Sequence, residues 1–266
     1  VDAQRLRAGV NNADEPEQVV PDAEVAARRQ SLEAEIAARE AKLAAQFPAT
    51  EDEDKSAHLA RRFGEWLRQA QADAVDWQVL RPREMSTNLP RLELLDDRSI
   101  FSTGDITKRD VFRLAFRLPP DGEPVTALRL EVLPDERLPA GGPGRAYYEG
   151  RKGDFFLSEI IATADGETLA FDGASHSFGK ISIGSGNADA ANVIDGDGST
   201  GWSTATREGE PHQLVLNLAQ PLSPGSELHL EMLFERHFAA SLGRFRVSAT
   251  AATQPAQATT LPVPLE

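Results

Sequence analysis

The chain has 266 residues, enough for one large domain or two modest ones. Lys and Arg total 28 against 42 Asp and Glu, which leaves a formal net charge of -14. Such an acidic surface repels phosphate backbones, so nucleic acid is not an expected partner. The lack of cysteine excludes disulfides and thiolate chemistry, and no apolar run is long enough for a membrane span. No signal peptide or initiator Met opens the sequence, so we expect a piece of a longer protein.

The first part of the chain divides into a polar lead and a helical region. Residues 1–21 are polar and acidic, and we expect them to be poorly ordered. Residues 22–75 are predicted to form a helical hairpin, because the sequence after Asp22 is rich in Ala, Glu, Arg and Gln. Asp22 is the expected N-cap, Pro48 ends the first helix, and Thr50 with the acids after it starts the second.

The second predicted helix carries an apolar stripe. Leu59, Phe63, Trp66, Leu67 and Ala70 recur at helical spacing. The stripe can close against the first helix or against the next domain. We therefore interpret the hairpin as a structural arm or spacer.

From residue 77 onward the pattern changes to short strands. Eight segments are predicted as strands: 77–82, 91–104, 111–119, 126–134, 154–163, 212–219, 227–235 and 243–250. Leu128 and Leu130 alternate with Arg129, as expected when one face of a strand is buried. Gly- and Pro-rich turns separate several of them, which predicts an antiparallel β-sandwich or jelly roll over residues 76–252. Residues 253–266 are expected to be a linker.

The densest cluster of functional residue types lies in residues 191–202. Asp195 and Asp197 stand two apart among glycines, and Thr200 follows. Carboxylates, a hydroxyl and backbone carbonyls are the hard oxygen ligands that calcium takes, although the spacing is not that of an EF-hand. The alternative is a loop of Asx turns, in which the aspartates accept hydrogen bonds from backbone N–H groups. The residues alone leave both hypotheses open.

The stretch A-N-V-I-D-G-D-G-S-T-G-W-S-T, followed by H-Q-L-V-L-N-L, resembles the start of a discoidin domain, also called a factor V/VIII C-type or galactose-binding-like domain. The resemblance implies a structural calcium ion, with ligands from Asp195, Asp197, Thr200 and Asn192. It also implies that Trp202 packs beneath the loop. The closing acidic ligand of the family lies near the C-terminal strand, where residues 243–250 supply no acid, and we name Glu159 as its replacement.

A longer resemblance covers most of the chain from Trp77 to Thr250. The segment from Ala127 to Ile160, the G-D-G-S-T-G-W loop and L-G-R-F-R-V-S-A-T are similar to a region of large planctomycete proteins. In those proteins domains of unknown function flank a helical segment and a discoidin-like sandwich, often behind a cytochrome c domain. The resemblance implies a periplasmic, cell-surface or secreted location and flanking domains as partners. No C-x-x-C-H motif is present, so no heme is expected in this segment.

A glycine-rich turn at residues 141–145 precedes two tyrosines. It lacks the Lys-Ser/Thr pair of a phosphate-binding P-loop, so we expect an inter-strand loop. Tyr147, Tyr148 and Arg145 have the chemistry to stack on a sugar ring and to hydrogen-bond its hydroxyls. The alternative for Arg145 is an ion pair with Asp135 that holds the loop in place.

The remaining candidate residues for sugar binding are Trp202, Arg207, His212 and His237. No two histidines stand four apart and no G-x-S-x-G motif occurs, so the sequence carries no dedicated catalytic motif. We therefore predict a non-catalytic carbohydrate-binding module of a larger secreted or envelope protein, with a glycan as partner. The alternatives are a structural module that positions flanking domains and, with least support, a polysaccharide hydrolase.

Overall fold

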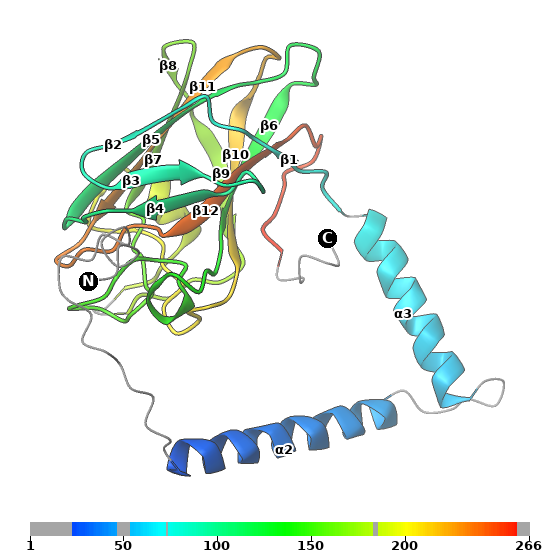
Figure 1. The fold of residues 1–266 in the computed structure, drawn as a ribbon. Coiled ribbons are helices and arrows are strands. Elements are labelled where there is room, and N and C mark those ends of the chain that lie inside the picture. Colours follow the sequence, from blue (N-terminus) through cyan, green and yellow to red (C-terminus); the bar gives the residue numbers. More distant parts are fainter. Residues whose placement is uncertain (1–22, 47–53, 73, 183–185, 260–266) are drawn as a thin grey trace. The chain divides into compact units, whose positions relative to one another are not determined.

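The computed structural model describes residues 23–46, 54–72, 74–182 and 186–259. The chain divides into two compact units, with the boundary between Ala74 and Val75. The first unit holds the helices and the second holds the strands (Figure 1). Neither described helix combines the length and the apolar character that crossing a membrane requires.

The helical unit contains the predicted hairpin-like pair, α2 (Ala23–Gln46) and α3 (Lys55–Ala72). Asp54, rather than Thr50, is the N-cap of α3, because its Oδ1 accepts a hydrogen bond of 2.8 Å from the backbone N–H of Ala57. The predicted N-cap Asp22, the helix-ending Pro48 and the lead at residues 1–21 lie outside the described residues.

The second unit is an antiparallel β-sandwich, as predicted. One sheet has the order β3 (Arg91–Leu94), β4 (Ile100–Thr103), β12 (Arg244–Thr250), β6 (Val125–Val132), β10 (His212–Leu222) and β9 (Phe171–His176), and β1 (Gln78–Val79) pairs with β12. The other has the order β2 (Glu84–Thr87), β5 (Arg109–Arg117), β11 (Glu227–Glu235), β7 (Glu159–Ala164) and β8 (Glu167–Thr168). The named strands pair antiparallel throughout.

The strands differ from the prediction at short or polar segments. The segment 91–104, expected as one strand, is the hairpin β3–β4. β2, β8 and β9 were not predicted, because two to six residues of polar or Gly-containing sequence show no clear apolar alternation. The longer strands β5, β6, β10, β11 and β12 all lie where the alternation predicted them.

The core fills the space between the two sheets. Phe112, Leu114 and Phe116 point inward from β5, and Leu130 and Val132 point inward from β6. Each such side chain contributes about 1.5–3 kcal/mol when it is removed from water. Because the period of a strand is two, Arg113 and Ala115, which alternate with these residues, point outward from the five-stranded sheet.

The outer face of the seven-stranded sheet is covered by segments from both ends of the unit. Ala256 is buried there, and the side chain of Asn217 bonds both its N–H (2.8 Å) and its carbonyl oxygen (3.0 Å). The expected linker at 253–266 is therefore wrong for its described part, residues 253–259. The polar composition of this segment did not predict its docking. Much of the contact consists of hydrogen bonds to backbone groups, which the pattern of side chains does not indicate.

Candidate functional site

The acidic loop lies against the outer face of the five-stranded sheet. It follows the short 3-10 helix η2 (Ala190–Ile194). A Cβ atom placed on Gly198 would lie 3.6 Å from Oε2 of Glu235 and 3.7 Å from Cδ2 of Leu233, both on β11. Glu159 of β7 pairs directly with Leu233, so its side chain stands on the same face beside the loop.

Asx turns form part of the loop, as one of the two hypotheses expected. Asp195 Oδ1 accepts the N–H of Asp197 at 2.8 Å, and Asp197 Oδ1 accepts the N–H of Ser199 at 3.0 Å. The hydroxyl of Thr200 lies 2.7 Å from Asp195 Oδ2. These hydrogen bonds satisfy the Asp197 carboxylate. The Asp195 carboxylate, however, also contacts a second acidic side chain.

That second acid is Glu159, of which only 8% is exposed. Its carboxyl group meets the carboxyl group of Asp195 and the N–H groups of Gly196 and Asp197. Burial, followed by the bond to and the charge of Asp195, raises the pKa of Glu159 to about 7. Its Oε1 is buried without a hydrogen-bond partner. Two carboxylates in contact need a proton or a cation between them.

The donor set fits calcium better than a transition metal. The oxygens near one another are those of Glu159 and Asp195, the Thr200 hydroxyl, and the main-chain carbonyls of Asn192 and Asp197, which lie 3.4 and 2.9 Å from that hydroxyl. No cluster of three or more acidic or histidine side chains suited to a metal occurs among the described residues. Carbonyl and hydroxyl oxygens would therefore complete the coordination.

The side chains of Asn192 and Asp197 form hydrogen bonds within the loop. The side-chain amide of Asn192 donates to the carbonyl of Gly201 at 3.1 Å, so it braces the loop and offers its main-chain oxygen instead. The Asp197 carboxylate accepts from Ser199, and these hydrogen bonds lower its pKa.

Trp202 packs into the core beneath the loop, as the discoidin resemblance implied. It is fully buried, its ring stands edge-on to Phe155 at 5.1 Å, and its Nε1 donates to the carbonyl of Phe178 at 2.8 Å. A ring without exposed surface has no face to offer a sugar, so the expectation that Trp202 binds a ligand is not supported.

Arg145 and His212 are buried as well. Arg145 donates to Ser102 Oγ at 3.0 Å and to the carbonyl of Gly104, and burial lowers its pKa to about 10. The expected ion pair with Asp135 is not formed. The Nδ1 atom of His212 lies 3.3 Å from a serine hydroxyl, and burial lowers the pKa of this imidazole. Both residues hold the fold together and do not reach a surface ligand.

The other predicted sugar-binding residues are accessible. Tyr148 is exposed and stands edge-on to Tyr147 at 4.7 Å. The guanidinium of Arg207 lies 4.5 Å from the ring of Phe178, and His237 is exposed. None of these four residues lines the groove described next.

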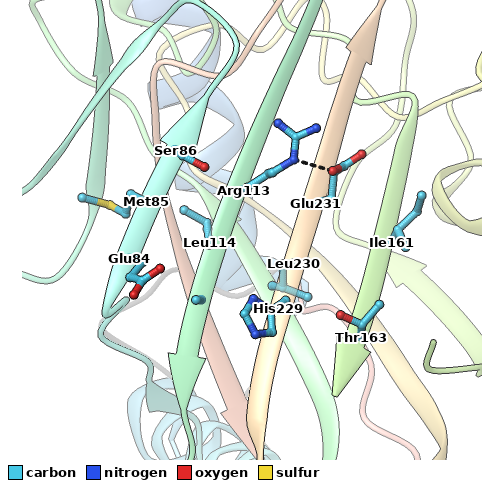
Figure 2. A pocket seen from close by; sticks show the side chains of 11 residues that line it. Glu84, Met85, Ser86, Arg113, Leu114, Ile161, Thr163, His229, Leu230 and Glu231 are labelled. Atoms are coloured by element: carbon cyan, nitrogen blue, oxygen red, sulfur yellow. Dashed lines mark hydrogen bonds and ion pairs between the residues drawn. The ribbon is translucent and has the colours of Figure 1, made fainter. Parts of the chain in front are cut away.

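A groove on the outer face of the five-stranded sheet was not predicted. It has a volume of about 470 Å³ and is built from four adjacent strands, β2, β5, β11 and β7 (Figure 2). The groove is lined by Glu84, Met85, Ser86, Arg113, Leu114, Ala115, Ile161, Thr163, His229, Leu230 and Glu231.

Ion pairs order the polar groups of the groove. Arg113 Nε donates to Glu231 Oε2 at 2.7 Å across the β5–β11 pair, as Figure 2 shows. His229 Nε2 lies 3.2 Å from a carboxylate oxygen of Glu227. The predicted strands 111–119 and 227–235 carry Arg113, His229 and Glu231 at polar positions that alternate with apolar ones, which is typical of an outer face. Nothing in the sequence distinguished that face from an ordinary solvated one, because its register with β2 and β7 depends on tertiary pairing.

Comparisons of the chain with protein-family models, curated proteins and solved structures find no match. Function must therefore be inferred from the geometry and chemistry of these two neighbouring sites.

Proposed function

We propose that the sandwich is a non-catalytic carbohydrate-binding module of a larger secreted or envelope protein, stabilised by a calcium ion in the acidic loop. The observation that carries the proposal is the groove on the outer face of the five-stranded sheet. Its volume lies within the range of about 300–1,000 Å³ typical of small-ligand sites.

The groove chemistry suits sugar hydroxyls, each of which both donates and accepts a hydrogen bond. A guanidinium, an imidazole, carboxylates and hydroxyls face the groove from strands, whose backbones hold them rigidly. Ile161 adds apolar surface for the C–H face of a sugar ring. No aromatic platform lines the groove, which favours a short or terminal glycan over a flat crystalline polysaccharide.

The partnerless oxygen of Glu159 supports the calcium part of the proposal. Glu159 and Asp195, with the Thr200 hydroxyl and nearby carbonyls, would hold the ion. When bound, the ion supplies the positive charge that two adjacent carboxylates require. The loop would then be cross-linked to β7, two residues before Ile161 in the groove wall.

The glycan hypothesis is tested by screening the whole chain on a glycan array, with calcium present throughout, and by titrating any hit calorimetrically. We expect Arg113→Ala and His229→Ala to weaken binding about tenfold or more, because the first removes a guanidinium and the second an imidazole that can hydrogen-bond a sugar hydroxyl. Arg109→Ala is the matched control, because Arg109 forms the same kind of cross-strand pair with Glu235 at 2.7 Å outside the groove.

Two results would contradict this assignment. One is that no glycan is retained. The other is that Tyr148→Ala or Arg207→Ala abolishes binding while Arg113→Ala does not, which would move the site to the exposed loops.

A further inference from the structure

Helix α3 presents an apolar stripe that the sandwich proposal does not use. Leu59, Phe63 and Trp66 follow one another at spacings of four and three residues, so they share one face of the helix. Their exposed fractions are 43%, 52% and 42%, and the rings of Phe63 and Trp66 are 5.6 Å apart. The stripe is therefore accessible on the described helix.

The charge of α3 is opposite to that of the chain. Its 18 residues contain Lys55, Arg61, Arg62 and Arg68 against the single acid Glu65, whereas the whole chain has a net charge of -14. At 100° per residue, Arg61 and Arg68 lie opposite the stripe, and Lys55 and Arg62 flank it. Glu65 pairs with both Arg61 (2.9 Å) and Arg62 (3.2 Å), which leaves the helix with a positive charge.

Helix α2 provides an internal comparison. It also exposes apolar side chains, those of Leu32 and Ile36. Yet it contains as many acids as bases and no aromatic residue. Both helices thus expose apolar side chains. Of the two, α3 alone combines exposed aromatic residues on one face with basic residues on the opposite face.

We propose that α3 binds, lying in the plane, to the surface of a bilayer that contains anionic phospholipids. Aromatic and aliphatic residues on one face with Lys and Arg on the other are the pattern of interfacial helices. Phe63 and Trp66 would enter the boundary between headgroups and acyl chains, and the basic side chains would meet lipid phosphates. Charge complementarity selects an anionic surface, which repels the acidic remainder of the chain and so confines contact to α3.

The test is co-sedimentation of the whole chain with vesicles of phosphatidylcholine alone or mixed equally with phosphatidylglycerol. We expect binding only to the mixed vesicles, weakening at least several-fold as salt rises to about 0.5 M. The double variant Phe63→Ala/Trp66→Ala should lose at least tenfold in partitioning. The matched control Leu32→Ala/Ile36→Ala, on the neutral helix, should bind like the unmodified chain.

A second readout follows the indole of Trp66. Its emission should shift to shorter wavelength on binding, and Trp66→Phe should remove the shift while keeping binding, since Trp202 is already buried and Trp77 is half-buried over the Arg129 guanidinium of the sandwich. Equal binding to both vesicle types, or unchanged binding of Phe63→Ala/Trp66→Ala, would overturn the proposal. So would self-association in light scattering that the same double variant abolishes, because the stripe would then be an interface between copies.

Discussion

Asp154 illustrates how a single buried acid controls stability at the residue scale. It lies inside the sandwich, where its Oδ1 accepts hydrogen bonds from Ser203 Oγ (2.7 Å) and from the N–H of Phe155 (2.8 Å). Burial outweighs these bonds and raises its pKa from 3.8 to about 6. The folded state therefore holds the proton more tightly than the unfolded chain. This contribution to stability is full below about pH 4 and is lost as the pH rises through about 6.

Asp154→Asn should remove that dependence. Relative to the unmodified chain, we expect the variant to gain about 2–3 kcal/mol in free energy of unfolding between pH 4 and pH 7. Urea unfolding at a series of pH values measures the difference.

Asp97→Asn is a control for this experiment, because its effect on stability should change with pH in the opposite direction. Although burial opposes it, hydrogen bonds from Ser99 and Arg244 lower the pKa of Asp97. Its contribution is present above pH 4 and is lost at lower pH, so Asp97→Asn should lose stability relative to the unmodified chain as the pH rises. Parallel pH profiles for Asp154→Asn and the unmodified chain would show that Asp154 does not titrate as described.

At the scale of elements, the acidic loop and β7 act as one unit. Residues 195–197 and Glu159 are far apart in the sequence, yet their carboxyl groups meet because β7 pairs with β11 beneath the loop. Asx turns alone would satisfy the aspartates, but they leave the Glu159 oxygen without a partner. A bound cation removes both the repulsion and the unsatisfied oxygen.

Calcium should therefore raise the melting temperature of the chain. At a concentration of 100 times the dissociation constant, binding adds about 2.7 kcal/mol. For a sandwich of this size that corresponds to a shift of about 5–10 °C between calcium and chelator. Differential scanning calorimetry measures the shift, and Glu159→Gln should reduce it by more than half. Melting that is the same in calcium and in chelator would remove the ion from the proposal.

At the scale of the whole sandwich, its two outer faces differ. Trp77 and Ala256 lie over the seven-stranded sheet, where Trp77 covers the Arg129 guanidinium at 4.8 Å. Beneath them, the buried Glu131 accepts two hydrogen bonds from Arg246, at 2.9 and 2.7 Å. The groove lies on the other sheet, whose outer face these covering segments leave open.

Asn217→Ala tests how firmly the C-terminal segment is held. It removes both bonds to Ala256 from a buried site, and we expect a loss of about 1–3 kcal/mol with faster amide exchange at Ala256. Asn88→Ala is the matched control, because Asn88 makes the same two kinds of backbone bond to Arg109 and Val111 at an exposed site. Its expected cost is below about 1 kcal/mol. An equal cost for the two variants would mean that the segment is only loosely docked.

Local patterns were sufficient for the fold class. Alternation in β5, β6 and β11 predicted the sandwich, and helix-forming composition predicted α2 and α3, because periods of two and 3.6 residues are properties of short segments. The oxygen-rich loop is also recognisable from its residues, and Glu159 is the acid that we name in place of the closing acid that the resemblance implies. By contrast, the sequence predicts ligand contacts for Trp202, Arg145 and His212, which are buried, because composition does not report burial.

Pairing between distant strands decided the rest. Glu159 meets Asp195, and four strands align Arg113, His229 and Thr163 in one groove, only because register places them on a common face. Register depends on which apolar faces meet in the core, and this involves every strand at once. Docking of residues 253–259 depends on Asn217 and other polar groups of the covered sheet. No local pattern encodes those contacts, because the packed sandwich creates the surface to which they belong.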